Sequence, residues 1–182
     1  MRLHHLLLAL CVAAPCVHAA IDESAYDSRT IRGADRPANA PRFSQYPAGP
    51  VFKGRLARPD VRSDPRARAF RTRITQDAAA GPNFAGHYTV VRWGCGTGCL
   101  GLAIVDVQSG KVHFPPNLRS LDNNNVAYEE LEGPDGPFTE FLPTSRLMVV
   151  AGGINENPKL RGISYFVWEN DRLRRIRFVA KP

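Results

Sequence analysis

The sequence has little cysteine and, after residue 19, no long apolar run. Two of the four cysteines among 182 residues, Cys11 and Cys16, lie in the apolar N-terminal segment, so only Cys95 and Cys99 lie beyond it. No later stretch approaches the roughly 20 apolar residues of a membrane helix, which excludes a transmembrane segment from the mature chain. A structural zinc site usually needs four ligands, and the pair of cysteines supplies only two of them.

Sequence patterns for several other activities are missing as well. No nucleic-acid-binding motif is present, and the acidic residues between 129 and 135 do not have the spacing of an EF-hand loop. The cysteines are separated by three residues rather than the two of a redox motif. Zinc bound by both cysteines with His87 and His113 would require His87 to fold back over eight residues of strand. We therefore expect no metal, no cofactor and no nucleic-acid partner.

The N-terminus has the pattern of a secretory signal peptide. Arg2 supplies a positive charge, residues 3–14 are almost wholly apolar, and Ala19 ends a small-residue cleavage site. Leu10 and Pro15, which precede the two leader cysteines, are not the small residues that lipoprotein processing favours. We therefore predict a signal peptide over residues 1–19 and a periplasmic or secreted, non-lipidated protein.

The formal net charge is +7, and the basic excess lies at the two ends of the chain. Residues 21–80 hold 12 Lys and Arg against 7 Asp and Glu, and residues 161–182 hold 6 against 2. Such a charge attracts an acidic protein or an anionic envelope polymer, in a manner that depends on salt. A solvated surface that aids solubility is the simpler interpretation. Nothing in the sequence indicates an oligomeric state.

The sequence predicts an arm followed by one domain. Residues 20–63 are rich in Pro, Arg, Ala and Asp and have too little clustered apolar surface to offset chain entropy, so a partly disordered arm is expected. Phe43, Tyr46 and Phe52 are the arm residues that could dock on the domain, which spans residues 64–182.

The domain is predicted to be α+β and mainly β. Asp64 and Pro65 are typical of a helix start, and apolar residues at spacings of three and four predict one amphipathic helix over about 64–80. From about 84 to 180 the periodicity is that of strands, which favours an antiparallel meander of about 6–8 strands with the helix packed on it. Two hairpins resemble propeller blades, but the chain is too short for a closed propeller.

The stretch WGCGTGC lies between two predicted strands and carries the main functional hypothesis. In an oxidising compartment the thiols of Cys95 and Cys99 tend to pair, and opposed strand residues are close enough for a disulfide. This predicts a three-residue tip with a clamp that contributes only about 2 kcal/mol. A rigid glycine-rich tip can bind a partner, while a turn that merely needs glycine and protection from proteolysis is the alternative. The candidate binding residues are Arg92, Trp93, Gly96, Thr97 and Gly98.

Residues 83–99, NFAGHYTVVRWGCGTGC, resemble a group of uncharacterised exported bacterial proteins. The similarity extends over about residues 64–180, with NFAGHY and WGCGxxC as the distinctive parts. The resemblance implies export and a clamped strand pair. No known activity comes with it.

These observations favour an exported, soluble, non-catalytic binding or accessory protein of the bacterial envelope, for example an inhibitor. The clamped hairpin would be its recognition element. The alternative is a small periplasmic hydrolase that uses His87 with a carboxylate, Asp106 or Glu140, as its catalytic residues. A pocket that encloses His87 and a carboxylate would favour the hydrolase.

Overall fold

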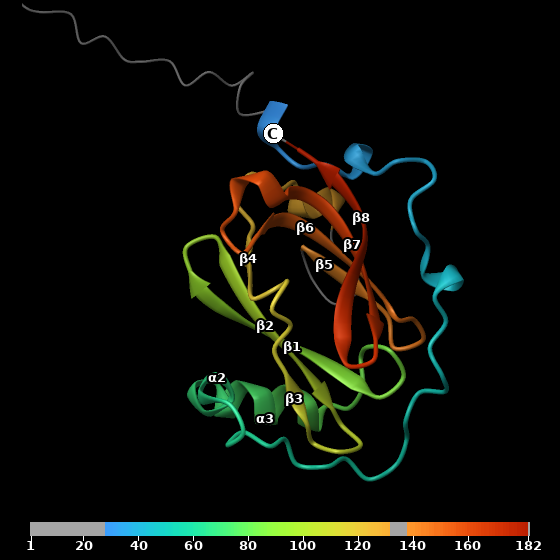
Figure 1. The fold of residues 1–182 in the computed structure, drawn as a ribbon, viewed down its shortest axis with the longest axis vertical. Coiled ribbons are helices and arrows are strands. Elements are labelled where there is room, and N and C mark those ends of the chain that lie inside the picture. Colours follow the sequence, from blue (N-terminus) through green and yellow to red (C-terminus); the bar gives the residue numbers. More distant parts are fainter. Residues whose placement is uncertain (1–27, 132–137, 182) are drawn as a thin grey trace, which may run out of the picture.

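An open antiparallel sheet of eight strands, with few helices, dominates the computed structural model, which describes residues 28–131 and 138–181 (Figure 1). The predicted mainly β, antiparallel architecture is thereby confirmed. The strands are β1 (Tyr88–Gly96), β2 (Cys99–Asp106), β3 (Val112–His113), β4 (Ser120–Asp122), β5 (Thr139–Phe141), β6 (Leu147–Ile154), β7 (Arg161–Glu169) and β8 (Arg172–Ala180).

The main path of the sheet runs β1-β2-β4-β6-β7-β8, with β3 paired to β2 and β5 paired to β6. The sheet curls so that the start of β1 lies beside the turn between β7 and β8, where the Tyr88 hydroxyl donates a hydrogen bond to Asp171. The curl encloses an apolar cluster that includes Phe84, Ile104 and Phe166. Alternation along the strands sends one set of side chains into this cluster and the other set to the outer face.

Two short helices, α2 (Pro65–Ala69) and α3 (Arg71–Ala79), cover the outer face of β1 and β2. Asp64 caps α2 by accepting from the amide of Arg66, as its sequence predicts. The predicted single helix is interrupted at Phe70, which has φ −104° and ψ 21° and stacks its ring on Trp93. Ile74 is fully buried beneath α3, so the apolar stripe faces the sheet.

Residues 28–63 run along the outside of the domain from the end of β8 to the helices (Figure 1). Ile31 forms a parallel bridge with Val126, and Phe43 and Tyr46 pack on the outer face of β6 and β7. Further along, the amide of Phe52 donates to a carbonyl in the loop before β1. Composition suggested a partly disordered arm because the segment has no core of its own. Over these residues the sheet supplies the apolar surface and hydrogen-bond partners that the segment lacks.

Short 3₁₀ turns account for the remaining regular structure. They are η1 (Gly33–Asp35), η2 (Phe43–Gln45), η3 (Tyr128–Glu130) and η4 (Pro158–Leu160). Within the described ranges, no helix has the length and apolar character needed to cross a membrane.

Candidate functional site

The turn between β1 and β2 is closed by a disulfide between Cys95 and Cys99, whose Cα atoms lie 5.1 Å apart. The register differs from the expected one. Gly96, rather than Cys95, pairs with Cys99, so the turn contains only Thr97 and Gly98. Cys95 is the extra residue of a bulge between Gly94 and Gly96, and Gly96 accommodates this irregularity with φ +141°.

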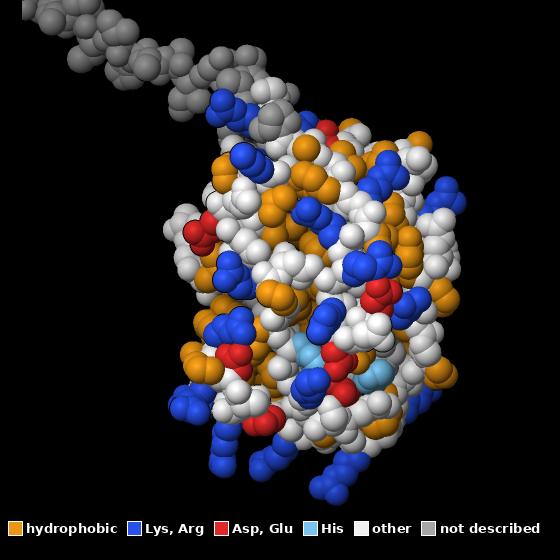
Figure 2. All heavy atoms as spheres, in the orientation of Figure 1, with side chains coloured by type: hydrophobic (Ala, Val, Ile, Leu, Met, Phe, Trp, Pro, Cys, Tyr) orange, Lys and Arg blue, Asp and Glu red, His pale blue; other side chains and the backbone are white. Residues whose placement is uncertain are grey.

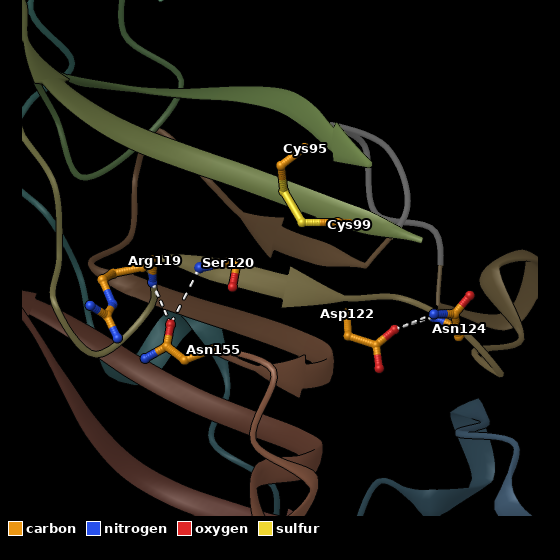
Figure 3. The surroundings of a disulfide bond; sticks show 7 residues. All are labelled: Cys95, Cys99, Arg119, Ser120, Asp122, Asn124 and Asn155. Atoms are coloured by element: carbon orange, nitrogen blue, oxygen red, sulfur yellow. Dashed lines mark hydrogen bonds between the residues drawn. A yellow bond between two sulfur atoms is a disulfide. The ribbon is translucent and has the colours of Figure 1, made fainter. Parts of the chain in front are cut away.

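Strand β4 holds this turn from one side (Figure 3). Cys99 pairs with Asp122, and the amide of Asn123 donates to the carbonyl of Gly98 at 2.9 Å. Asp122 accepts hydrogen bonds from the backbone amide of Asn124 at 2.9 Å and from its side-chain amide at 2.6 Å. The covalent clamp therefore adds to a backbone connection that already fixes the turn.

Strand β4 is itself short and is fixed at its other end by Asn155 (Figure 3). The side-chain oxygen of Asn155 accepts from the amides of Arg119 at 2.7 Å and Ser120 at 3.3 Å. Asn155 follows β6 directly, so the start of β4 is tied to the centre of the sheet. This links the turn to the rigid part of the molecule.

The outer part of the turn, residues 94–97, is exposed, and Thr97 carries its only polar side chain. Gly98 has φ +68°, and a Cβ there would collide with the side chain of Asn124. Gly94, by contrast, has open space where a Cβ would lie. The exposed surface of this turn therefore consists of backbone, the Cys95 side of the disulfide and one hydroxyl group.

The other two candidate binding residues, Arg92 and Trp93, direct their side chains to neighbours within the protein. The Trp93 ring stacks on Phe70 with centroids 4.2 Å apart and also covers Gly101. Arg92 donates to the hydroxyl of Thr139 at 2.6 Å. Both side chains thus have packing roles, and the binding hypothesis narrows to the glycines and threonine of the turn.

The candidate catalytic residues fall into two places. His87 Nε2 lies 3.9 Å from Asp106 Oδ1, which is beyond hydrogen-bond reach. Asp106 accepts from the amide of Gln108 at 2.8 Å and from the hydroxyl of Ser109 at 2.6 Å, so its carboxylate holds the turn before β3. Glu140 forms a bidentate ion pair with Arg36 of the arm and lines a different groove from His87.

A polar cluster that the sequence did not reveal surrounds Asp171. Its carboxylate accepts from the Tyr88 hydroxyl at 3.0 Å and from Lys111 Nζ at 2.9 Å, while His113 Nε2 lies 3.9 Å away. The Lys111 hydrogen bond and that of Tyr88 lower the pKa of Asp171. Burial, together with the Asp171 charge, raises the pKa of Tyr88 to about 12. Because 83 residues separate Tyr88 from Asp171, no local pattern could have predicted this contact.

Asp171 reaches this cluster through the tight turn between β7 and β8. Glu169 pairs with Arg172, and the two turn residues, Asn170 and Asp171, both have positive φ, 49° and 59°. Two such residues are typical of the hairpin turn that matches strand twist, and Asn and Asp tolerate this conformation better than most side chains. The turn places the carboxylate over the start of β1.

No group of three or more His, Cys, Asp or Glu side chains is placed to hold a metal ion within residues 28–131 and 138–181. The zinc set considered from the sequence, the two cysteines with His87 and His113, is accordingly not assembled there. No family model, no curated protein and no solved structure matches this chain.

Proposed function

We propose that this is an exported binding protein of the bacterial envelope that recognises its partner with the clamped turn between β1 and β2. The observation that carries the proposal is the exposed turn of residues 94–97, closed by the Cys95–Cys99 disulfide and attached to β4. A loop that is ordered before binding loses less conformational entropy when it binds. The signal-peptide pattern supports export. The disulfide supports it as well, because disulfides persist in oxidising compartments.

The shape of the turn favours a partner with a concave site. Gly94 and Gly96, in the exposed segment 94–97, have no side chains, so another chain could approach the backbone closely there. The basic strand β8, with Arg172, Arg174, Arg175 and Arg177, would attract an acidic partner from a distance. The same charges also protect this edge strand from pairing with other chains. They are therefore weaker support for an acidic partner than the turn is for a partner with a concave site.

Capture from an envelope extract at two salt concentrations tests this proposal with three matched variants. Thr97→Arg adds bulk at the tip and leaves the disulfide intact, and Cys95→Ser/Cys99→Ser removes the clamp. Gln108→Arg makes the same kind of change at an exposed residue of another turn and leaves the hydrogen bond from Ser109 to Asp106 in place. We expect a partner that is lost with Thr97→Arg, weakened without the disulfide and retained with Gln108→Arg. The same partners with all variants, or none with the native chain, would contradict the proposal.

A small hydrolase remains the second candidate because His87 lines an open groove of about 380 Å³ together with the carboxylates Glu169 and Asp171. No serine or cysteine of the described residues lines this groove, so His87 would have to activate water. Hydrolysis of 4-nitrophenyl esters tests this candidate. A rate above background that disappears in His87→Gln would support it, and equal rates in both proteins would exclude ester hydrolysis at this groove.

A further inference from the structure

A strongly basic surface lies at the end of the molecule where the arm meets α2 and α3. Residues 53–80 hold eight Lys and Arg against three Asp. Figure 2 shows Lys and Arg side chains projecting from the lower end of the molecule, where Figure 1 places the two helices. Two of the three acids, Asp64 and Asp77, already pair with Arg66 and Arg73. The segment therefore carries more positive charge than its own acids neutralise.

Four exposed arginines of this segment form one surface, which we call the basic end: Arg58, Arg62, Arg68 and Arg71. Arg68 Nη2 lies 3.5 Å from the carbonyl oxygen of Arg62, and Arg71 Nη1 lies 3.4 Å from that of Arg68. Arg58 and Arg62 line one open groove of about 450 Å³ together with Thr75 of α3. None of the four makes an ion pair with a residue in the part of the chain that the structure describes. Their charges are therefore available to a partner.

The groove between Arg58 and Arg62 favours an anion. Both guanidinium groups belong to exposed side chains, and Thr75 adds an exposed hydroxyl that can donate a third hydrogen bond. Asp60 also lines the groove, but its Oδ1 accepts from the backbone amide of Arg62 at 3.0 Å and so holds the turn before α2. Two arginines against one aspartate leave the groove with an excess of positive charge.

The use of arginine at all four positions of the basic end favours phosphate over other anions. A guanidinium group donates two parallel hydrogen bonds to two oxygens of one phosphate, which the ammonium group of lysine does not. A surface that served solubility alone would be expected to mix charges of both signs. Like charges on one surface repel each other, and an array of phosphates removes that cost.

We propose that the basic end docks on the surface of an anionic phospholipid membrane. One headgroup phosphate lies in the groove between Arg58 and Arg62, and Arg68 and Arg71 contact neighbouring headgroups. A lipid surface fits better than an acidic protein, because long side chains projecting from an exposed end need a dense array of phosphates and no complementary shape. Each basic residue near such a surface contributes about fivefold in affinity, and salt weakens the attraction. The inference takes export from the proposed function and is independent of the clamped turn.

Sedimentation with lipid vesicles tests this docking, with protein recovered after export. Vesicles of phosphatidylglycerol mixed with phosphatidylcholine are compared with vesicles of phosphatidylcholine alone, at low and high salt. We expect binding to the mixed vesicles at low salt only. Arg58→Gln/Arg62→Gln should weaken that binding about 25-fold. Arg42→Gln/Lys159→Gln is the matched control, because it removes two exposed charges outside the basic end, and it should weaken binding less than about threefold.

Several results would overturn the proposal. Equal losses in the two double variants would reduce the effect to net charge, and equal binding to phosphatidylcholine alone would exclude headgroup charge as its cause. Displacement from the vesicles by inorganic phosphate, but not by chloride at equal ionic strength, would assign the groove to the free ion. Tighter binding to heparin than to the mixed vesicles would make an acidic polymer the partner.

Two further variants separate this test from folding and from the clamped turn. Arg68→Gln/Arg71→Gln should lose as much vesicle binding as Arg58→Gln/Arg62→Gln, so the proposal stays testable if either variant does not fold. Cys95→Ser/Cys99→Ser should bind the vesicles as the native protein does. A loss of vesicle binding in that variant would tie the docking to the turn and contradict the independence of the two surfaces.

Discussion

Removing the disulfide by Cys95→Ser/Cys99→Ser is expected to cost little stability, although the clamp defines the turn. The two residues are only four positions apart in sequence. On the loop-entropy relation, closing a ring of about five residues restricts the unfolded chain by about 2 kcal/mol. The folded turn is also held by the Asn123 to Gly98 hydrogen bond and the pairing of Cys99 with Asp122, so its position does not depend on the bond alone.

Urea and thermal unfolding of the native and double-serine proteins measure this cost. A loss of about 2 kcal/mol corresponds to a fall in midpoint temperature of about 4–8 °C for a chain of this size. Near-ultraviolet circular dichroism should show intact packing of Trp93 on Phe70. A loss above about 4 kcal/mol, or collapse of the aromatic signal, would show that the bond supports the whole sheet and refute the reasoning. No loss at all, with two free thiols by mass spectrometry, would show that the bond does not form.

Three further outcomes follow from the geometry. Gly98→Ala should destabilise by about 1–2 kcal/mol because φ is positive there, whereas Gly94→Ala, with open space and an ordinary backbone, should stay within about 0.5 kcal/mol in urea unfolding. Trp93→Ala should cost about 3 kcal/mol in the same assay and Thr97→Ala almost nothing; equal small costs would contradict the packing role of Trp93. Burial lowers the pKa of His113. Below about pH 6.5 the unfolded chain therefore binds a proton at His113 more readily than the folded chain does. Stability should therefore fall between pH 7 and 5, and His113→Phe should reduce that slope; an unchanged slope would assign it to other groups.

Features set by neighbouring residues could be predicted from the sequence. Asp64 and Pro65 indicated the start of α2, the change to a period of two indicated β1 and β2, and the two remaining cysteines indicated the disulfide. In each case the interacting groups lie within a few residues of one another. Local propensity and periodicity are sufficient for such features.

Features that depend on distant contacts could not be predicted. The break at Phe70 accompanies its stacking on Trp93, and the bulge at Cys95 depends on the register with β2. The path of the arm follows from surfaces that the sheet provides, such as the bridge between Ile31 and Val126. A composition rule reports what a segment can bury by itself and takes no account of the apolar surface that a neighbouring sheet supplies.

The curl of the sheet keeps the clamped turn apart from the groove that His87 and Asp171 line. Strand β2 carries the clamped turn at Cys99 and pairs with β3 at Ile104, five residues further along. At about 3.3 Å per residue these positions are roughly 17 Å apart, with β4 fixing the first and the β7–β8 turn closing over the second. Changes at such a distance normally have additive effects on stability. A substitution at Thr97 should therefore leave the groove lined by His87 intact, so the capture experiment and the ester-hydrolysis assay can be carried out on the same folded protein without one result deciding the other.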